Sequence, residues 1–179
     1  SYNASQEIFK MFKKINPNGV TVWGGPNFPL DMPSQEKFMK KHSEVDVYVP
    51  TDGEVGFSNV VKLLLNSNSR QNICNELLST PIEGCISRDI NGKLHHIFSD
   101  TRIKNLDEIP SPYSMGLMDK FFDGLLTPML QTNRGCPFHC SFCTDGKNEV
   151  DTINNFSLER VNSDLNYIAE HVPKTTHSL

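Results

Sequence analysis

The sequence predicts an α/β fold, and three observations indicate it. Short β-rich runs alternate with segments of helical period over the first 66 residues, a pattern typical of a parallel sheet covered by helices. Asn91-Gly92 stands between two apolar runs and predicts a β-hairpin. A candidate strand at 125–132 leads into a cysteine-rich loop, which a segment of helical period follows, so this part of the chain predicts a β/α unit.

The front of the chain predicts three helices and two strands. Residues 5–15 have the period of an amphipathic helix, which Asn3 or Ser5 could cap; its apolar stripe is Ile8, Met11, Phe12 and Ile15. Strands are expected at 20–23 and 45–49, with a helix at 34–42 between them. Another helix is expected after Asp52-Gly53-Glu54, with apolar residues at spacings of three and four: Phe57, Val60, Val61, Leu64 and Leu65.

The polar run at 66–70 predicts a boundary, so the expected division is 1–66, 67–120 and 121–179. The middle part contains the hairpin, with strands at 84–89 and 93–98, and an extended, proline-containing stretch at 100–115. In the last part, Ser157 is expected to cap a helix. The apolar positions of that helix are Leu158, Val161, Leu165, Ile168 and Val172.

Composition narrows the class of protein. The chain has 179 residues, a formal net charge of −4 and a hydrophobic share of 37%, which fits a globular protein. No apolar run approaches the roughly 18 residues of a membrane span, and no signal segment opens the sequence, so a cytoplasmic location is predicted. The scattered Lys and Arg residues argue against a nucleic-acid-binding surface. Cys74 and Cys85 stand alone and are expected to be small buried side chains.

Three further cysteines form the most informative motif. Cys136, Cys140 and Cys143 have C-x3-C-x2-C spacing, which brings three thiolates together within eight residues. A structural zinc site needs four ligands, whereas an iron–sulfur cubane held by three cysteines keeps one iron open for another ligand. Zinc and redox-active thiols remain alternatives, and His139 could serve as a fourth zinc ligand or lie at the surface. Arg134 could tune a cluster by its charge or form an ordinary salt bridge.

The cysteine spacing resembles the cluster motif of radical S-adenosylmethionine (SAM) enzymes. Together with further motifs, the chain resembles radical SAM proteins that carry an N-terminal cobalamin-binding domain. These motifs are, in order, Trp23-Gly-Gly-Pro26, Val45-Asp-Val-Tyr48, Asp52-Gly-Glu with Phe57, Pro-Ser-Pro-Tyr113 and Arg134-Gly-Cys136. The resemblance implies part of a Rossmann-like (flavodoxin-like) cobalamin-binding domain, a β-hairpin linker, and the first β/α unit of a radical SAM (β/α) barrel.

The resemblance also implies roles for individual residues. The three motif cysteines would hold a [4Fe–4S] cluster, and Phe142 would lie near the adenine of SAM. Five residues would border cobalamin: Gly24, Gly25, Pro26, Gly53 and Glu54. The chain departs from the family's Gly-Glu-Gly-Glu at residues 51–54 and lacks its Asp-x-His-x-x-Gly segment, so no histidine is assigned to cobalt. For Gly24 and Gly25 a plain tight turn is an equal alternative.

The implied activity is reductive cleavage of SAM that starts radical chemistry, with cobalamin-dependent methyl transfer to an unactivated carbon as the expected outcome. It would use an external electron donor of flavodoxin or ferredoxin type and a small-molecule or peptide substrate that the sequence does not identify. The alternative is a non-catalytic module with a structural zinc or iron–sulfur site. A full barrel takes about 200 residues or more, so we expect an internal fragment that is inactive alone. Asp119, Asp123 and Asp145 are expected at the solvated surface.

Overall fold

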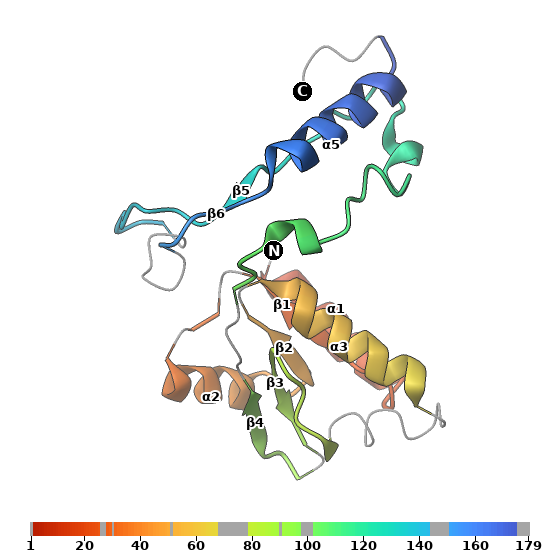
Figure 1. Cartoon of the computed structure of the whole chain (residues 1–179). Coiled ribbons are helices and arrows are strands. Elements are labelled where there is room, and N and C mark those ends of the chain that lie inside the picture. The colour runs from red at the N-terminus through yellow and green to blue at the C-terminus, as the bar shows by residue number, and fades with distance from the viewer. Residues whose placement is uncertain are drawn as a thin grey trace. The chain divides into compact units, whose positions relative to one another are not determined.

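The computed structural model describes residues 2–25, 28–29, 31–50, 52–67, 79–89, 91–97, 102–143 and 151–174. The chain forms two compact units, residues 1–102 and residues 103–179 (Figure 1). Both helices and strands are present, as the α/β prediction requires. The predicted division at 66/67 and 120/121 remains a prediction about domains.

The first unit contains a four-stranded mixed sheet. Its strands are β1 (Val22–Gly24), β2 (Val47–Val49), β3 (Cys85–Arg88) and β4 (Leu94–Ile97), in the order β1-β2-β3-β4. The pair β1–β2 is parallel, whereas β2–β3 and β3–β4 are antiparallel. The predicted parallel pair and the predicted hairpin are both confirmed. The hairpin does not stand alone in a linker, because β3 pairs with β2 and extends the sheet.

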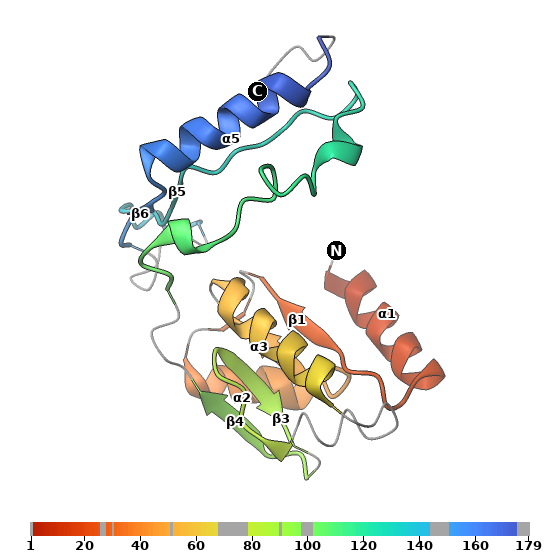
Figure 2. The same ribbon diagram turned by 45° about the vertical axis from the view of Figure 1, so that its right-hand side comes forward.

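Helices cover both faces of this sheet (Figure 2). They are α1 (Tyr2–Ile15), α2 (Met32–Lys41) and α3 (Gly53–Asn66). On one face, Val60 and Leu64 of α3 pack with the cluster of Val47, Val49, Ile82 and Cys85. On the other face, Met39 and Phe38 of α2 pack with the cluster of Phe28, Val45, Tyr48 and Ile86. Successive strand residues therefore point to opposite faces, as the pleat of a strand requires.

Helix α1 packs differently from the prediction. Its expected apolar stripe is largely exposed, with Ile8 at 62% and Ile15 at 82%. Phe9 instead packs onto the sheet, where the centroid of its ring lies 5.6 Å from the ring centroid of Trp23. Lys13, one helical turn later, forms an ion pair with Asp46, so the face that meets the sheet is half polar. The cap was also wrong, because the helix already includes Asn3 and Ser5.

The second unit contains η1 (Leu106–Glu108), η2 (Asp119–Phe121), β5 (Asn133–Arg134), β6 (Asn154–Asn155) and α5 (Leu158–His171). The strand expected at 125–132 is wrong: in that part of the chain the only described strand residues are the two of β5, which follow it. Leu125 and Met129 are 88% and 86% exposed, because no described strand pairs with this segment and buries it. The stretch expected to be extended at 100–115 is only partly so among the described residues, since η1 and a series of turns interrupt it.

The N-cap of α5 is confirmed. The side chain of Ser157 accepts a hydrogen bond from the backbone N–H of Arg160 at 3.1 Å. Ile168, in the predicted apolar stripe, is fully buried. Over the described residues, none of the helices combines the length and apolar character needed to cross a membrane.

Candidate functional site

The cysteine loop, residues 135–143, begins directly after β5. Strand β5 pairs antiparallel with β6, with Asn133 opposite Asn155 and Arg134 opposite Asn154. The backbone N–H of Phe156 donates to the carbonyl of Thr132 at 3.1 Å and extends this ladder by one bond. The chain that enters the cysteine loop and the chain that leads into α5 are therefore held side by side.

The three motif cysteines are accessible, but the structure does not gather them into a finished metal site. Cys136 is half-buried, whereas Cys140 and Cys143 are exposed, and all three are free thiols. A hydrogen bond of 3.1 Å from the N–H of Cys143 to the carbonyl of Cys140 closes a turn between them. No group of three or more His, Cys, Asp or Glu side chains in the described part of the chain is arranged to hold a metal ion. The donor set nevertheless fits iron, because thiolates are the ligands of iron–sulfur clusters.

The loop residues from 137 to 143 are all exposed. Phe142, predicted to lie near SAM, is 91% exposed, and Phe138 is 68% exposed. His139 is exposed as well. The Nε of Arg134 donates to Oε1 of Gln131 at 3.4 Å. The loop thus offers thiols and aromatic rings at its surface.

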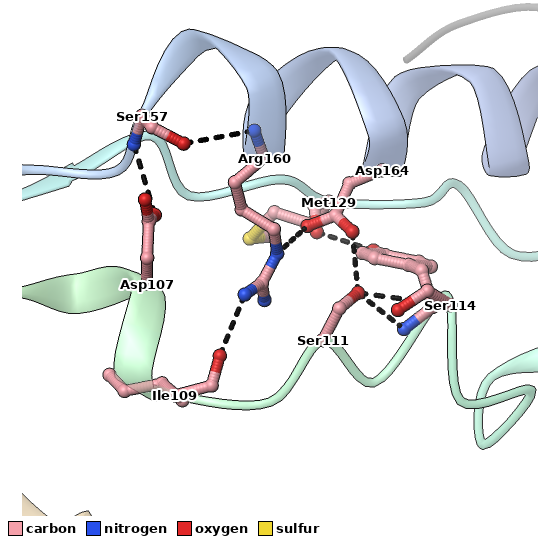
Figure 3. A network of polar contacts seen from close by, with 9 residues as sticks. Asp107, Ile109, Ser111, Ser114, Met129, Ser157, Arg160 and Asp164 are labelled. Atoms are coloured by element: carbon pink, nitrogen blue, oxygen red, sulfur yellow. Dashed lines mark hydrogen bonds and ion pairs between the residues drawn. The ribbon is translucent and has the colours of Figure 1, made fainter.

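Residues 103–113 hold the segment that follows the loop (Figure 3). Asn154 donates from Nδ2 to the carbonyl of Ile103 at 3.0 Å. Asp107 accepts from the N–H of Ser157 at 3.0 Å, and this bond holds the pKa of the Asp107 carboxyl below its usual range. The start of α5 is therefore anchored by a carboxylate, where the helix dipole also favours negative charge.

The predicted cobalamin residues lie at the carboxyl ends of β1 and β2. Gly24 pairs with Val49 across the parallel strands, and a Cβ at Gly24 would stand 3.2 Å from the Val49 carbonyl oxygen. Gly25 has a φ of 110°, and nothing lies within 4 Å of a Cβ built there. The carbonyl of Gly25 accepts from the hydroxyl of Tyr48 at 2.6 Å. The local backbone accounts for both glycines, while the space over Gly25 leaves room for a ligand. Pro26 lies outside the described residues.

Gly53 and Glu54 open α3 at the same edge of the sheet. A Cβ at Gly53 would meet only Val49 Cγ1, at 3.9 Å, an ordinary contact. The preceding Asp52 forms an ion pair with Arg102, with 3.2 Å between Oδ2 and Nε. Parallel strands followed by a helix N-terminus make this edge suitable for a phosphate-bearing ligand.

The remaining candidates have structural roles. Asp119 accepts from the hydroxyl of Tyr167 at 2.9 Å, and this bond raises the pKa of the tyrosine. Asp123 accepts from two successive backbone N–H groups, those of Leu125 and Leu126. Cys85 is buried in the sheet, as predicted, and burial raises the pKa of its thiol to about 12. Cys74 and Asp145 lie outside the described residues.

Sequence reasoning missed the polar contacts between residues 103–113 and α5. Arg160 and Asp164 form an i,i+4 ion pair, with 2.9 Å between Nε and Oδ2. Their spacing is visible in the sequence, but only the fold reveals that Arg160 also donates from Nη1 to the carbonyl of Ile109 at 2.7 Å.

Three known proteins are similar to the chain. It is 28% identical over 183 residues to the cobalamin-dependent radical SAM methyltransferase TokK of Streptomyces tokunonensis, covering 96% of the chain and 24% of that protein. It is 26% identical over 178 residues to the 2-(S-pantetheinyl)-carbapenam-3-carboxylate methyltransferase of Streptantibioticus cattleyicolor, with the same two coverages. An uncharacterized methyltransferase of Pyrococcus horikoshii is 31% identical over 163 residues, covering 90% of the chain and 33% of the relative. No protein-family model matches.

The chain is thus homologous to part of known methyltransferases. TokK is a cobalamin-dependent radical SAM methyltransferase, the class that the resemblance predicted, and the chain corresponds to part of its length. The chain spans between about a quarter and a third of the length of these relatives.

Proposed function

We propose that the chain is part of a radical SAM enzyme that holds a [4Fe–4S] cluster through Cys136, Cys140 and Cys143. The observation that carries the proposal is the accessible C-x3-C-x2-C motif, directly after β5, in a chain homologous to a cobalamin-dependent radical SAM methyltransferase. Three thiolates satisfy three irons of such a cluster and keep the fourth open for SAM. When bound, the cluster supplies the electron that cleaves SAM reductively.

The chain's own residues would bind and shield this centre. The three thiols must lose their protons to bind iron, and the loop must draw them together, because they are not gathered in the described structure. Phe138 and Phe142 are exposed aromatic rings beside the thiols, and we assign Phe142 to the adenine of SAM. An electron donor of flavodoxin or ferredoxin type would deliver the electron.

Anaerobic reconstitution with iron and sulfide tests the proposal. We expect a broad visible absorption that shifts when SAM is added. A protein that stays colourless and binds zinc through the same cysteines would contradict the proposal and favour a structural metal module, with His139 as a candidate fourth ligand.

We further propose that Gly24, Gly25, Pro26, Gly53 and Glu54 bind cobalamin as part of a Rossmann-like (flavodoxin-like) domain. The parallel β1–β2 pair, the space over Gly25 and the N-terminus of α3 support this assignment. The reaction proposed for the whole protein is cobalamin-dependent methyl transfer to an unactivated carbon.

Trp23 makes the cobalamin proposal testable, because it is the chain's single tryptophan and adjoins Gly24. Cobalamin absorbs visible and near-ultraviolet light, so hydroxocobalamin bound at this edge should quench Trp23 fluorescence saturably. Gly53→Leu should weaken the affinity measured by this quenching about tenfold. A Cβ at position 53 fits without a clash, but the longer leucine side chain would occupy the space at the sheet edge. The control is Lys62→Leu, an exposed position nearer the other end of α3. Absent or non-saturable quenching in the wild-type chain would refute the assignment.

A further inference from the structure

A buried hydroxyl–carboxylate contact joins residues 103–113 to the helix that follows the cysteine loop. The Oγ of Ser111 donates to Oδ1 of Asp164 at 2.5 Å, and the two residues are only 5% and 4% exposed (Figure 3). Asp164 also holds Arg160 through its other oxygen. A buried carboxylate with both oxygens paired fixes its partners firmly, because losing one partner would leave the charge unsatisfied.

The same serine also orders the next turn of the chain. Its Oγ accepts from the backbone N–H groups of Tyr113 at 3.2 Å and Ser114 at 3.1 Å. With one bond donated and two accepted, the hydroxyl of Ser111 is fully used. Asp164 therefore helps to fix the backbone of Tyr113, because it holds the Ser111 hydroxyl that accepts the Tyr113 N–H.

Tyr113 reaches the segment that precedes the cysteine loop. Its hydroxyl donates to the carbonyl of Met129 at 2.5 Å, and the residue is only 5% exposed. Its ring stacks on Phe122, with 6.3 Å between ring centroids and 8° between planes. The carbonyl of Met129 lies in an irregular stretch without a strand partner among the described residues, so this bond replaces the missing ladder bond there.

We propose that Ser111 and Tyr113 are positioning residues for the cysteine loop. Hydrogen bonds at Ser111 and at both ends of Tyr113 form a path from Asp164 to Met129, which links the chain after the loop to the chain before it. The β5–β6 ladder joins the same two segments next to the loop, so the base of the loop is held twice. This inference rests on the proposed cluster, and it assigns the Pro-Ser-Pro-Tyr motif to holding that cluster.

The physical effect expected is on retention of the cluster. The three thiols have to be brought together when iron binds, and a fixed loop base lowers the conformational entropy that this step costs. Residues that orient metal ligands without touching the metal commonly change metal affinity about 10–100-fold when mutated.

Tyr113→Phe tests the inference, because it removes one hydroxyl and keeps the buried ring. The matched control is Tyr167→Phe in the same unit, which removes the hydroxyl that bonds Asp119 outside this path. Each variant of the 179-residue chain is reconstituted anaerobically, and loss of iron to a chelator is timed. We expect loss about tenfold faster for Tyr113→Phe than for the wild-type chain, and an unchanged rate for Tyr167→Phe.

Hydrogen exchange of the β5 and β6 amides, measured without iron, provides a second readout. We expect faster exchange at these amides in Tyr113→Phe and no change in the control. Equal iron loss and equal exchange in Tyr113→Phe and the wild-type chain would overturn the inference and leave the cluster proposal standing. A wild-type chain that takes up no cluster would overturn both.

Discussion

Cys85 and the three loop cysteines have the same side chain in opposite surroundings. Cys85 is buried in the sheet, and burial raises the pKa of its thiol to about 12, so it stays protonated near neutral pH. Only the thiolate reacts with alkylating reagents. Iodoacetamide should therefore modify Cys140 and Cys143 in the native iron-free chain and leave Cys85 unmodified until the chain is unfolded. Peptide mass spectrometry checks this, and rapid native labelling of Cys85 would contradict the described packing.

Asp46, directly before β2, is a buried carboxylate that contacts Thr21, directly before β1, and Lys13 of α1. Its Oδ2 accepts from the backbone N–H of Thr21 at 2.8 Å and lies 2.5 Å from the Nζ of Lys13. Asp46→Ala should lower the free energy of unfolding by about 2 kcal/mol, because it leaves the buried N–H of Thr21 without its acceptor and removes the ion pair of Lys13.

Urea unfolding followed by Trp23 fluorescence measures this loss. The control is Glu36→Ala, whose 3.6 Å ion pair with Lys40 is exposed and should contribute less than about 0.5 kcal/mol. Equal effects of the two substitutions would show that the Asp46 contacts stabilise the fold no more than an exposed ion pair does.

At the scale of single elements, the start of α5 has a local determinant. Ser157→Ala removes the side-chain bond to the N–H of Arg160 and should cost about 1 kcal/mol. Ser163→Ala, at an exposed position inside the same helix, should not destabilise it, because alanine has the higher helix propensity. Thermal unfolding followed by circular dichroism compares the two. A smaller effect at Ser157 than at Ser163 would contradict the cap.

The same helix start should respond to pH. The pKa of Asp107 is lowered because its carboxylate accepts the backbone N–H of Ser157. A lowered folded-state pKa stabilises the fold above the unfolded pKa, and that contribution is lost as pH falls through the folded pKa. The Ser157 amide should therefore exchange slowly with solvent at neutral pH. Its protection against exchange should fall as the pH drops through the folded-state pKa of Asp107, because the protonated carboxyl accepts the N–H less well. Asp107→Asn should remove this pH dependence.

Elements with local signals could be predicted from the sequence. The caps, the helical periods and Asn91-Gly92 act over a few residues, and α2, α3, α5 and the hairpin follow them. Local signals could not decide whether 125–132 forms a strand, because a strand exists only when a partner strand pairs with it. The face of α1 was likewise undecidable from period alone, since Phe9 and Lys13 meet the sheet through Trp23 and Asp46.

The ligands of the candidate site could be predicted from the sequence, but the contacts that hold the cysteine loop in place could not. Cysteine spacing alone identifies three thiol ligands, because thiolate chemistry does not depend on the rest of the fold. The polar path through Ser111 and Tyr113 joins residues that are far apart in sequence. Such contacts leave no local pattern, so only the fold could reveal them.

At the scale of the whole molecule, the two compact units carry different parts of the proposal. The first unit has the sheet edge assigned to cobalamin, and the second has the cysteine loop. The chain covers 24% of the cobalamin-dependent radical SAM methyltransferase to which it is similar. We therefore expect this chain to take up a cluster without turning over SAM by itself. Formation of methionine and 5′-deoxyadenosine by the reduced 179-residue chain would contradict this expectation.

Iron and acid-labile sulfide content after anaerobic reconstitution tests the cluster assignment most directly. The wild-type chain and Cys85→Ala should each bind about four irons and four sulfides per chain. Alanine at Cys136, Cys140 or Cys143 should reduce both contents severalfold, because a cluster held by three thiolates does not tolerate the loss of one. Full iron and sulfide content in any of these three variants, or bound zinc without sulfide in the wild-type chain, would contradict the assignment.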